Sequence, residues 1–82
     1  TIEGVETESQ SNLVSLRFNY HSEKTLQVMV YDAVGKLLYA GEASAIKGEN
    51  AHQMDFTAAS SGMYILTITD GIEVASTKIL KQ

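Results

Sequence analysis

The sequence contains no cysteine, no proline and no tryptophan among its 82 residues, and it has only two histidines, His21 and His52. The absence of cysteine excludes a disulfide framework and thiolate metal sites, which small domains often use to offset the entropy of ordering a short chain. The absence of cysteine does not indicate the cellular compartment, because secreted domains also exist without disulfides. The fold must therefore be stabilised by packing and backbone pairing.

Positive charge is also scarce: six Lys and Arg residues stand against ten Asp and Glu residues, for a net charge of −4. Three acidic residues lie in the first twelve positions, which contain no Lys or Arg, so the rest of the chain is nearly neutral. No basic stripe is available to neutralise a phosphate backbone, and we expect no nucleic-acid partner. No apolar run approaches the roughly 20 residues that a membrane helix needs.

The chain is long enough for one domain at most. At this size folding hides only about 60% of the surface of the unfolded chain, which leaves little core for an active-site cavity. Residues 1–12, "TIEGVETESQSN", have the acidic, polar composition of a linker or a short edge strand. We expect the domain body to span residues 13–82.

Alternation of apolar and polar residues predicts strands along most of this body. The clearest strands are "LVSLRFNY" (13–20), "TLQVMVYD" (25–32), "MYILTIT" (63–69) and "IEVASTKIL" (72–80), with weaker ones at 36–43 and 52–56 and a possible first strand at 2–7. Turn signals separate them, and no helical period is present. About seven short strands of this kind indicate an all-β fold, an antiparallel β-sandwich of immunoglobulin-like type.

Two turns have a physical explanation in the sequence. In "YDAVGK" the Asp32 side chain can accept hydrogen bonds from turn amides, and Gly35 can take the left-handed conformation that closes a hairpin loop of three to five residues. In "SSGMY" the spacing of Gly62 and Tyr64 predicts a tyrosine whose hydroxyl bonds back to nearby backbone at a corner of the sandwich. Both features indicate structure and not an active site.

The pair Asp70-Gly71 predicts a two-residue hairpin, because both central positions of a type I′ turn need positive φ. In that register Leu66 faces Ala75, and Ile79 points into the core. The outer face of the last strand then carries Lys78 and Leu80, with Lys81 past the last buried position. A three-residue loop or a bulge would reverse this parity.

Catalytic and ligand sites are weakly represented. His52, Asp55 and Ser60 or Ser61 are the residue types of a hydrolytic triad, but the sequence has no Gly-x-Ser-x-Gly elbow, and we expect no enzyme activity. The two histidines lack metal-ligand spacing, so we expect them in surface loops, with no metal and no cofactor. Exposed aromatic rings would suit a carbohydrate-binding sandwich, yet most aromatic residues here fit core or strand-face positions.

The segments "LVSLRF", "LQVMVYDAVGKLL", "MDFTAASSGMYILTI" and the terminal "TKILKQ" together resemble the C-terminal sorting domains (type A) of the Bacteroidetes type IX secretion system, over about residues 13–82. In that family a strand ends in Tyr-Asp, a turn supplies Gly-Lys before an apolar pair, Ser-Gly-x-Tyr opens the penultimate strand, and the chain finishes with Lys-apolar-apolar-Lys. These positions are Asp32, Gly35, Lys36, Leu37, Gly62, Tyr64, Lys78, Ile79, Leu80 and Lys81. We expect Asp32, Gly35, Lys36, Gly62 and Tyr64 to have structural roles, and we add the hairpin residues Asp70 and Gly71 to this group.

The resemblance implies a non-enzymatic domain at the carboxyl end of a larger cargo protein. Such a domain folds in the periplasm, is recognised by the secretion machinery, and is commonly removed at the cell surface by a sortase, so that the cargo of a Gram-negative cell reaches its surface or the medium. Cleavage would fall within residues 1–12. Our hypothesis for the contact with the translocon is the terminal segment Lys78, Ile79, Leu80, Lys81 and Gln82, with β-augmentation at the free edge of the last strand. The alternative is that its lysines only keep an edge strand soluble.

One departure from the family pattern leaves an alternative open. The family usually opens with a strand and a Pro-Asn-Pro segment, whereas this chain has "VETESQS" and no proline. The alternative is a small secreted or periplasmic immunoglobulin-like sandwich of unknown function, such as an adhesion or carbohydrate-binding module. In either case free sheet edges favour a monomer or a weak edge-strand dimer.

Overall fold

The computed structural model describes all residues from 1 to 82 and contains seven strands and no helix. The strands are β1 (Glu3–Gln10), β2 (Leu13–Tyr20), β3 (Lys24–Asp32), β4 (Leu37–Ala45), β5 (Gly48–Asp55), β6 (Gly62–Thr69) and β7 (Val74–Lys81). The order of elements confirms the all-β class that alternation predicts. No helix that could cross a membrane is present.

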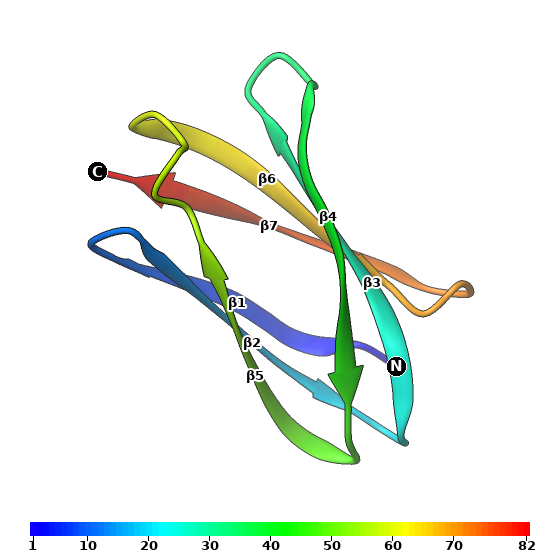
Figure 1. The fold of residues 1–82 in the computed structure, drawn as a ribbon. Helices are drawn as coiled ribbons and strands as arrows, with labels where there is room; N and C mark the ends of the chain where they lie inside the picture. The colour runs from blue at the N-terminus through cyan, green and yellow to red at the C-terminus, as the bar shows by residue number, and fades with distance from the viewer.

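The strands form two antiparallel sheets that face one another as a sandwich (Figure 1). One sheet has the order β1-β2-β5 and the other has the order β4-β3-β6-β7. The edge strands β1 and β7 lie in contact along one side of the sandwich. The chain end leaves β7 beside the loop that joins β5 to β6, at the opposite end of the molecule from Thr1 (Figure 1).

The core consists of the inward-facing residues of both sheets. On β2, β3 and β6 every second residue is buried, namely Val14, Leu16, Phe18, Tyr20, Leu26, Val28, Val30, Tyr64, Leu66 and Ile68. Leu16, Leu26, Leu66, Ile68 and Ile79 are among the side chains with no measurable exposure. Period-two alternation identifies these faces because successive side chains of a strand point to opposite sides of the sheet.

β1 and β5 extend beyond their predicted limits. β5 begins at Gly48 and not at residue 52, and its full length pairs with β2. Only Met54 of this strand is fully buried, so backbone pairing and not an apolar face defines its first half. β1 pairs with the other edge of β2 with a shift in register between Glu3 and Glu6, where Gly4 has a φ of 61°. Residues 3–10 therefore form an edge strand here, and Ile2 joins the core.

The two-residue hairpin predicted at Asp70-Gly71 is wrong. Thr69 pairs with Val74, so the loop has four residues, and Leu66 pairs with Thr77 in place of Ala75. The Asp70 carboxylate accepts hydrogen bonds from the backbone N–H groups of Ile72 (2.8 Å) and Glu73 (2.7 Å), which closes a wider loop. Only Gly71 has positive φ there. Because the register moves by two residues, the inward and outward faces of β7 are still those predicted.

Candidate functional site

The last strand presents alternating environments at the end of the chain. Ile79 has 0% exposure and pairs with Tyr64 of β6, whereas Leu80 is 62% exposed and pairs with Met63. Lys78 is exposed on the same outer face as Leu80. Within the terminal segment, the structure therefore separates an inward anchor from two outward side chains.

The outward side chains belong to a larger surface. Opposite Lys78 lies Ile65, and opposite Leu80 lies Met63, which is 43% exposed. We call these four residues, Met63, Ile65, Lys78 and Leu80, the outer β6–β7 surface. The two β6 residues are not among the contact residues predicted from the sequence. Their alternation with the buried Tyr64 nevertheless indicates that they face outward.

The sequence predicts Lys81 past the last buried position, and this prediction is wrong. Lys81 is only 8% exposed and continues the inward parity of Ile79. Its ammonium Nζ donates hydrogen bonds to the carbonyl oxygens of Phe56, at 2.5 Å, and Ala59. The aliphatic stem allows an inward lysine to pass along apolar surface and deliver its charge to polar atoms at the rim. Gln82, the final residue, is exposed.

The outer edge of β7 is partly covered. β1 lies alongside it, and the Thr7 hydroxyl donates a hydrogen bond of 2.6 Å to the Lys78 carbonyl. A partner strand that paired with β7 along this edge would first have to displace β1. The side-chain face of β7, by contrast, is open at Lys78 and Leu80.

The turn residues of the family motif have the predicted contacts. The Asp32 carboxylate accepts hydrogen bonds from the N–H groups of Val34 (3.0 Å) and Lys36 (2.9 Å), and Gly35 has a φ of 91°. The loop between β3 and β4 is thus closed by one side chain and one left-handed residue. Leu37 follows as the first residue of β4 and is exposed.

The corner tyrosine is also confirmed. The Tyr64 hydroxyl donates a hydrogen bond to the carbonyl of Ser60, four residues earlier, at 2.5 Å. Its ring packs edge-on against Phe56, with 5.7 Å between the ring centroids. Gly62 has a φ of 149° at the start of β6. These residues therefore fix the path by which the chain crosses from the first sheet to the second.

Asp70 forms an anchor between the two sheets. Besides the two loop amides, its carboxylate accepts a hydrogen bond of 2.7 Å from the hydroxyl of Tyr20, at the end of β2. The N–H of Glu73, the Tyr20 hydroxyl and the N–H of Ile72, in decreasing order, hold the pKa of Asp70 well below its ordinary value. The same hydrogen bond, together with burial and the negative charges of Asp70 and Glu73, raises the pKa of Tyr20 to about 12.

We expect this pair to give the domain a pH-dependent stability. A lowered carboxyl pKa stabilises the fold above the unfolded value of about 3.9, and this stabilisation is lost as the pH falls toward the folded pKa. A raised tyrosine pKa stabilises the fold below about pH 10, and this part is lost as the pH rises to about 12. Denaturant unfolding measured across pH should show both decreases.

Two variants isolate the pair from other titrating groups. Tyr20→Phe removes the hydroxyl and should flatten the alkaline decrease. Asp70→Asn should reduce the acid decrease to the part that Asp55 contributes, and should weaken the alkaline decrease as well. Profiles that remain parallel to that of the native chain would contradict the assignment.

The residue types of a hydrolytic triad are not assembled. The Asp55 carboxylate accepts hydrogen bonds from the N–H and hydroxyl of Thr57, which lower its pKa, and no hydrogen bond joins it to His52. The surface-loop position predicted for His52 is wrong. His52 lies in β5 and is half-buried, and its Nε2 has no hydrogen-bond partner. No group of three or more His, Asp or Glu side chains is placed to hold a metal ion.

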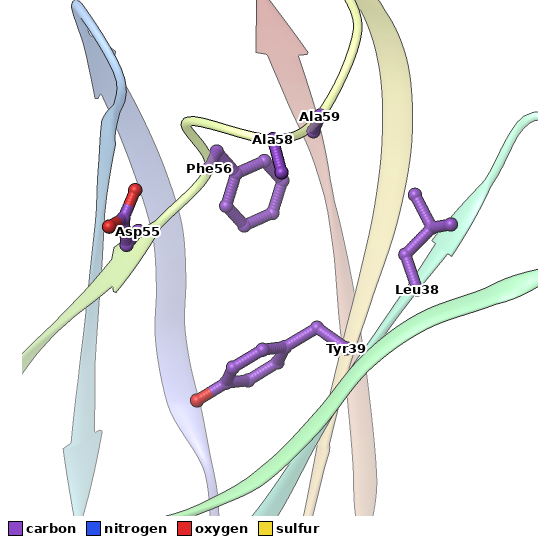
Figure 2. Close-up of a pocket in the computed structure, with 6 residues that line it drawn as sticks. All are labelled: Leu38, Tyr39, Asp55, Phe56, Ala58 and Ala59. Atoms are coloured by element: carbon purple, nitrogen blue, oxygen red, sulfur yellow. The ribbon is translucent and has the colours of Figure 1, made fainter.

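One apolar pocket of about 300 Å³ opens between the start of β4 and the loop after β5. Its lining residues are Leu38, Tyr39, Asp55, Phe56, Ala58 and Ala59. Figure 2 shows the rings of Phe56 and Tyr39 on either side of this space, with the Asp55 carboxylate directed away from it. The pocket therefore has no convergent polar groups that would indicate a catalytic or sugar-binding site.

Comparisons with individual proteins give a likeness in fold and no family. A search of the curated proteins found no match. Among solved structures, the Bifidobacterium adolescentis GH3 β-glucosidase superposes with a TM-score of 0.59 at 17% identity, over 98% of this chain. This chain spans only 16% of that enzyme, so the likeness concerns the fold alone.

A family model described as "Secretion system C-terminal sorting domain" matches residues 10–82. The match covers β2 to β7 and the terminal motif, which are the segments that carry the resemblance in the sequence. It is a family of sorting signals and not of enzymes. The chain belongs to the C-terminal sorting domains of the type IX secretion system.

Proposed function

We propose that this domain directs an N-terminally linked cargo protein through the type IX secretion machinery to the cell surface, and that the outer β6–β7 surface is what the machinery contacts. The observation that carries the proposal is the alternation at the end of β7. Buried Ile79 holds the strand in the core, and Lys78 and Leu80 project from it to solvent. A folded signal of this kind offers fixed side chains to a receptor without unfolding.

The composition of the surface supports a protein contact. Leu80 and Met63 are paired neighbours with large exposed fractions, and contiguous exposed apolar groups mark interaction sites more often than single ones do. Lys78 beside them takes part in no salt bridge within the chain. Its charge is therefore available to an acidic group of the partner. Gln82, also exposed, completes the proposed contact at the chain end.

We further propose that the domain folds in the periplasm and that a cell-surface sortase removes it within residues 1–12. β1 restricts where such an enzyme could cut, because residues 3–10 are hydrogen-bonded to β2. Proteases generally need extended, unpaired backbone in their clefts. Cleavage would thus occur at an end of this segment or after β1 leaves the sheet.

A reporter fusion tests the function. The 82-residue chain is joined to the C-terminus of a reporter with a periplasmic signal peptide, in a bacterium with the type IX machinery and in the same strain without its translocon. We expect the reporter at the surface or in the medium only when both the chain and the translocon are present. Retention of a reporter whose attached domain is folded would contradict the proposal, as would export without the translocon.

A further inference from the structure

The second lysine of the terminal motif has an unusual position for a cation. Lys81 closes β7, and its ammonium reaches two backbone carbonyls that lie 25 and 22 residues earlier in the chain. Lysine is almost never buried without partners for its charge. The contact is therefore a specific structural feature that surface solubility does not explain.

The two carbonyls belong to the loop that carries the chain from one sheet to the other. Phe56 and Ala59 follow β5, and the N–H of Ala59 donates to the Phe56 carbonyl at 3.0 Å. The N–H of Phe56 donates to the carbonyl of Asn12, at the β1–β2 turn. Lys81 thus connects the end of the last strand to the crossover loop, and through that loop to the first hairpin.

Charge complementarity supports the contact. The nearby Asp55 carboxylate has a lowered pKa, chiefly because Thr57 donates hydrogen bonds to it and in lesser part because of the positive charge of Lys81. The ammonium has three N–H donors, of which the two carbonyls use two. Loss of the ammonium would leave both carbonyl oxygens without this donor in a largely buried location.

We propose that Lys81 is a positioning residue, an internal clamp that fastens the end of β7 to the 56–59 loop and so keeps Lys78 and Leu80 on the outer face. The clamp stands on the hydrogen bonds and burial of Lys81, whereas its effect on export rests on the proposed function. The two lysines of the motif then differ in their roles. Lys78 meets the receptor, and Lys81 acts inside the domain.

The lack of cysteine permits a direct test, because Lys81→Cys introduces the only thiol in the chain. The unfolded variant is alkylated with 2-bromoethylamine, which forms a thioether and releases bromide to give a side chain of lysine length with its ammonium. A second sample is alkylated with 1-iodopropane, which gives the same length without charge. Both are refolded, and Lys78→Cys is treated identically as the matched control.

We expect the aminoethylated chain to recover the Tm of the native chain, and the propylated chain to melt lower by roughly 10 °C or more. Hydrogen exchange at the Ala59 amide should be about tenfold or more faster in the propylated chain, because the loop opens locally. At position 78 the two products should have equal Tm values. Equal Tm and exchange at position 81 would overturn the clamp.

A second variant separates the clamp from receptor contact. Lys81→Met in the reporter fusion should reduce export at high growth temperature and recover it at low temperature, where the weakened domain is folded. A folded Lys81→Met domain that stays unexported at every temperature would overturn the proposal, because the ammonium would then be a contact. Failure of the native fusion to be exported would contradict the proposed function, whereas the Tm and exchange results would still decide the clamp.

Discussion

Replacing Ile79 by alanine will lower the free energy of unfolding by about 2 to 5 kcal/mol. The side chain has 0% exposure and belongs to the core cluster, opposite Tyr64. Truncation removes buried methyl groups and leaves a cavity that the two sheets cannot fully close. Small single-core domains have only about 3 to 5 kcal/mol of net stability, so the loss approaches the whole. Urea unfolding followed by circular dichroism measures it.

The next residue provides the matched control. Leu80 is the same size but 62% exposed on the opposite face, so Leu80→Ala should change stability by no more than about 0.5 kcal/mol. Equal losses at the two positions would contradict the inward and outward assignment of β7. The comparison needs no secretion assay.

The difference in burial between Ile79 and Leu80 determines which variants can test the sorting signal. Deleting residues 78–82 removes Ile79 and Lys81 together with the exposed side chains. Such a deletion would unfold the domain, and loss of export would then say nothing about recognition. Substitutions confined to the outer face avoid this problem.

The double substitution Lys78→Glu with Leu80→Glu should abolish most export while the domain remains folded. Both side chains are exposed, so the core is unchanged and the Tm should stay close to that of the native chain. An interface hot spot contributes about 2 kcal/mol or more, which corresponds to a loss of affinity of about 30-fold. Reversal of the Lys78 charge adds repulsion from any acidic group of the receptor. The quantity to measure is the amount of reporter exposed at the cell surface, divided by the amount of folded domain.

The control for this variant lies on the other sheet. Leu13 and Arg17 are exposed on the outer face of β2, so Leu13→Glu with Arg17→Glu makes the same change in charge and in apolar surface. This control should be exported like the native chain. It excludes a general effect of added negative charge on secretion.

The parts of the fold that sequence could predict are those where side chains repeat with the period of the strand. Leu16, Leu26, Leu66 and their neighbours identify their strands and their buried faces because apolar and polar residues alternate there. The first half of β5 could not be predicted in this way. Gly48 to Ala51 pair through backbone groups that every residue has, and their side chains show no apolar face.

Hydrogen bonds between residues far apart in the sequence also explain what sequence missed at the candidate site. The hairpin loop was assigned to Asp70-Gly71 from turn propensity alone, but the Asp70 carboxylate accepts two loop amides and the hydroxyl of Tyr20, and these bonds favour a four-residue loop. The predicted register makes Ile79 the last buried position, with Lys81 beyond it. The partners of Lys81 are carbonyl oxygens of a distant loop, and nothing in the local pattern signals them.

We propose that the sorting signal is the outer face of β7 on an intact sandwich. Its most direct test compares the amount of surface-exposed reporter for two double variants. One is Lys78→Glu with Leu80→Glu, and the other is the control Leu13→Glu with Arg17→Glu. The purified domains of both variants should first be shown to have the native Tm. We expect strong loss of export for the first variant and native export for the second. Equal export of the two would contradict it.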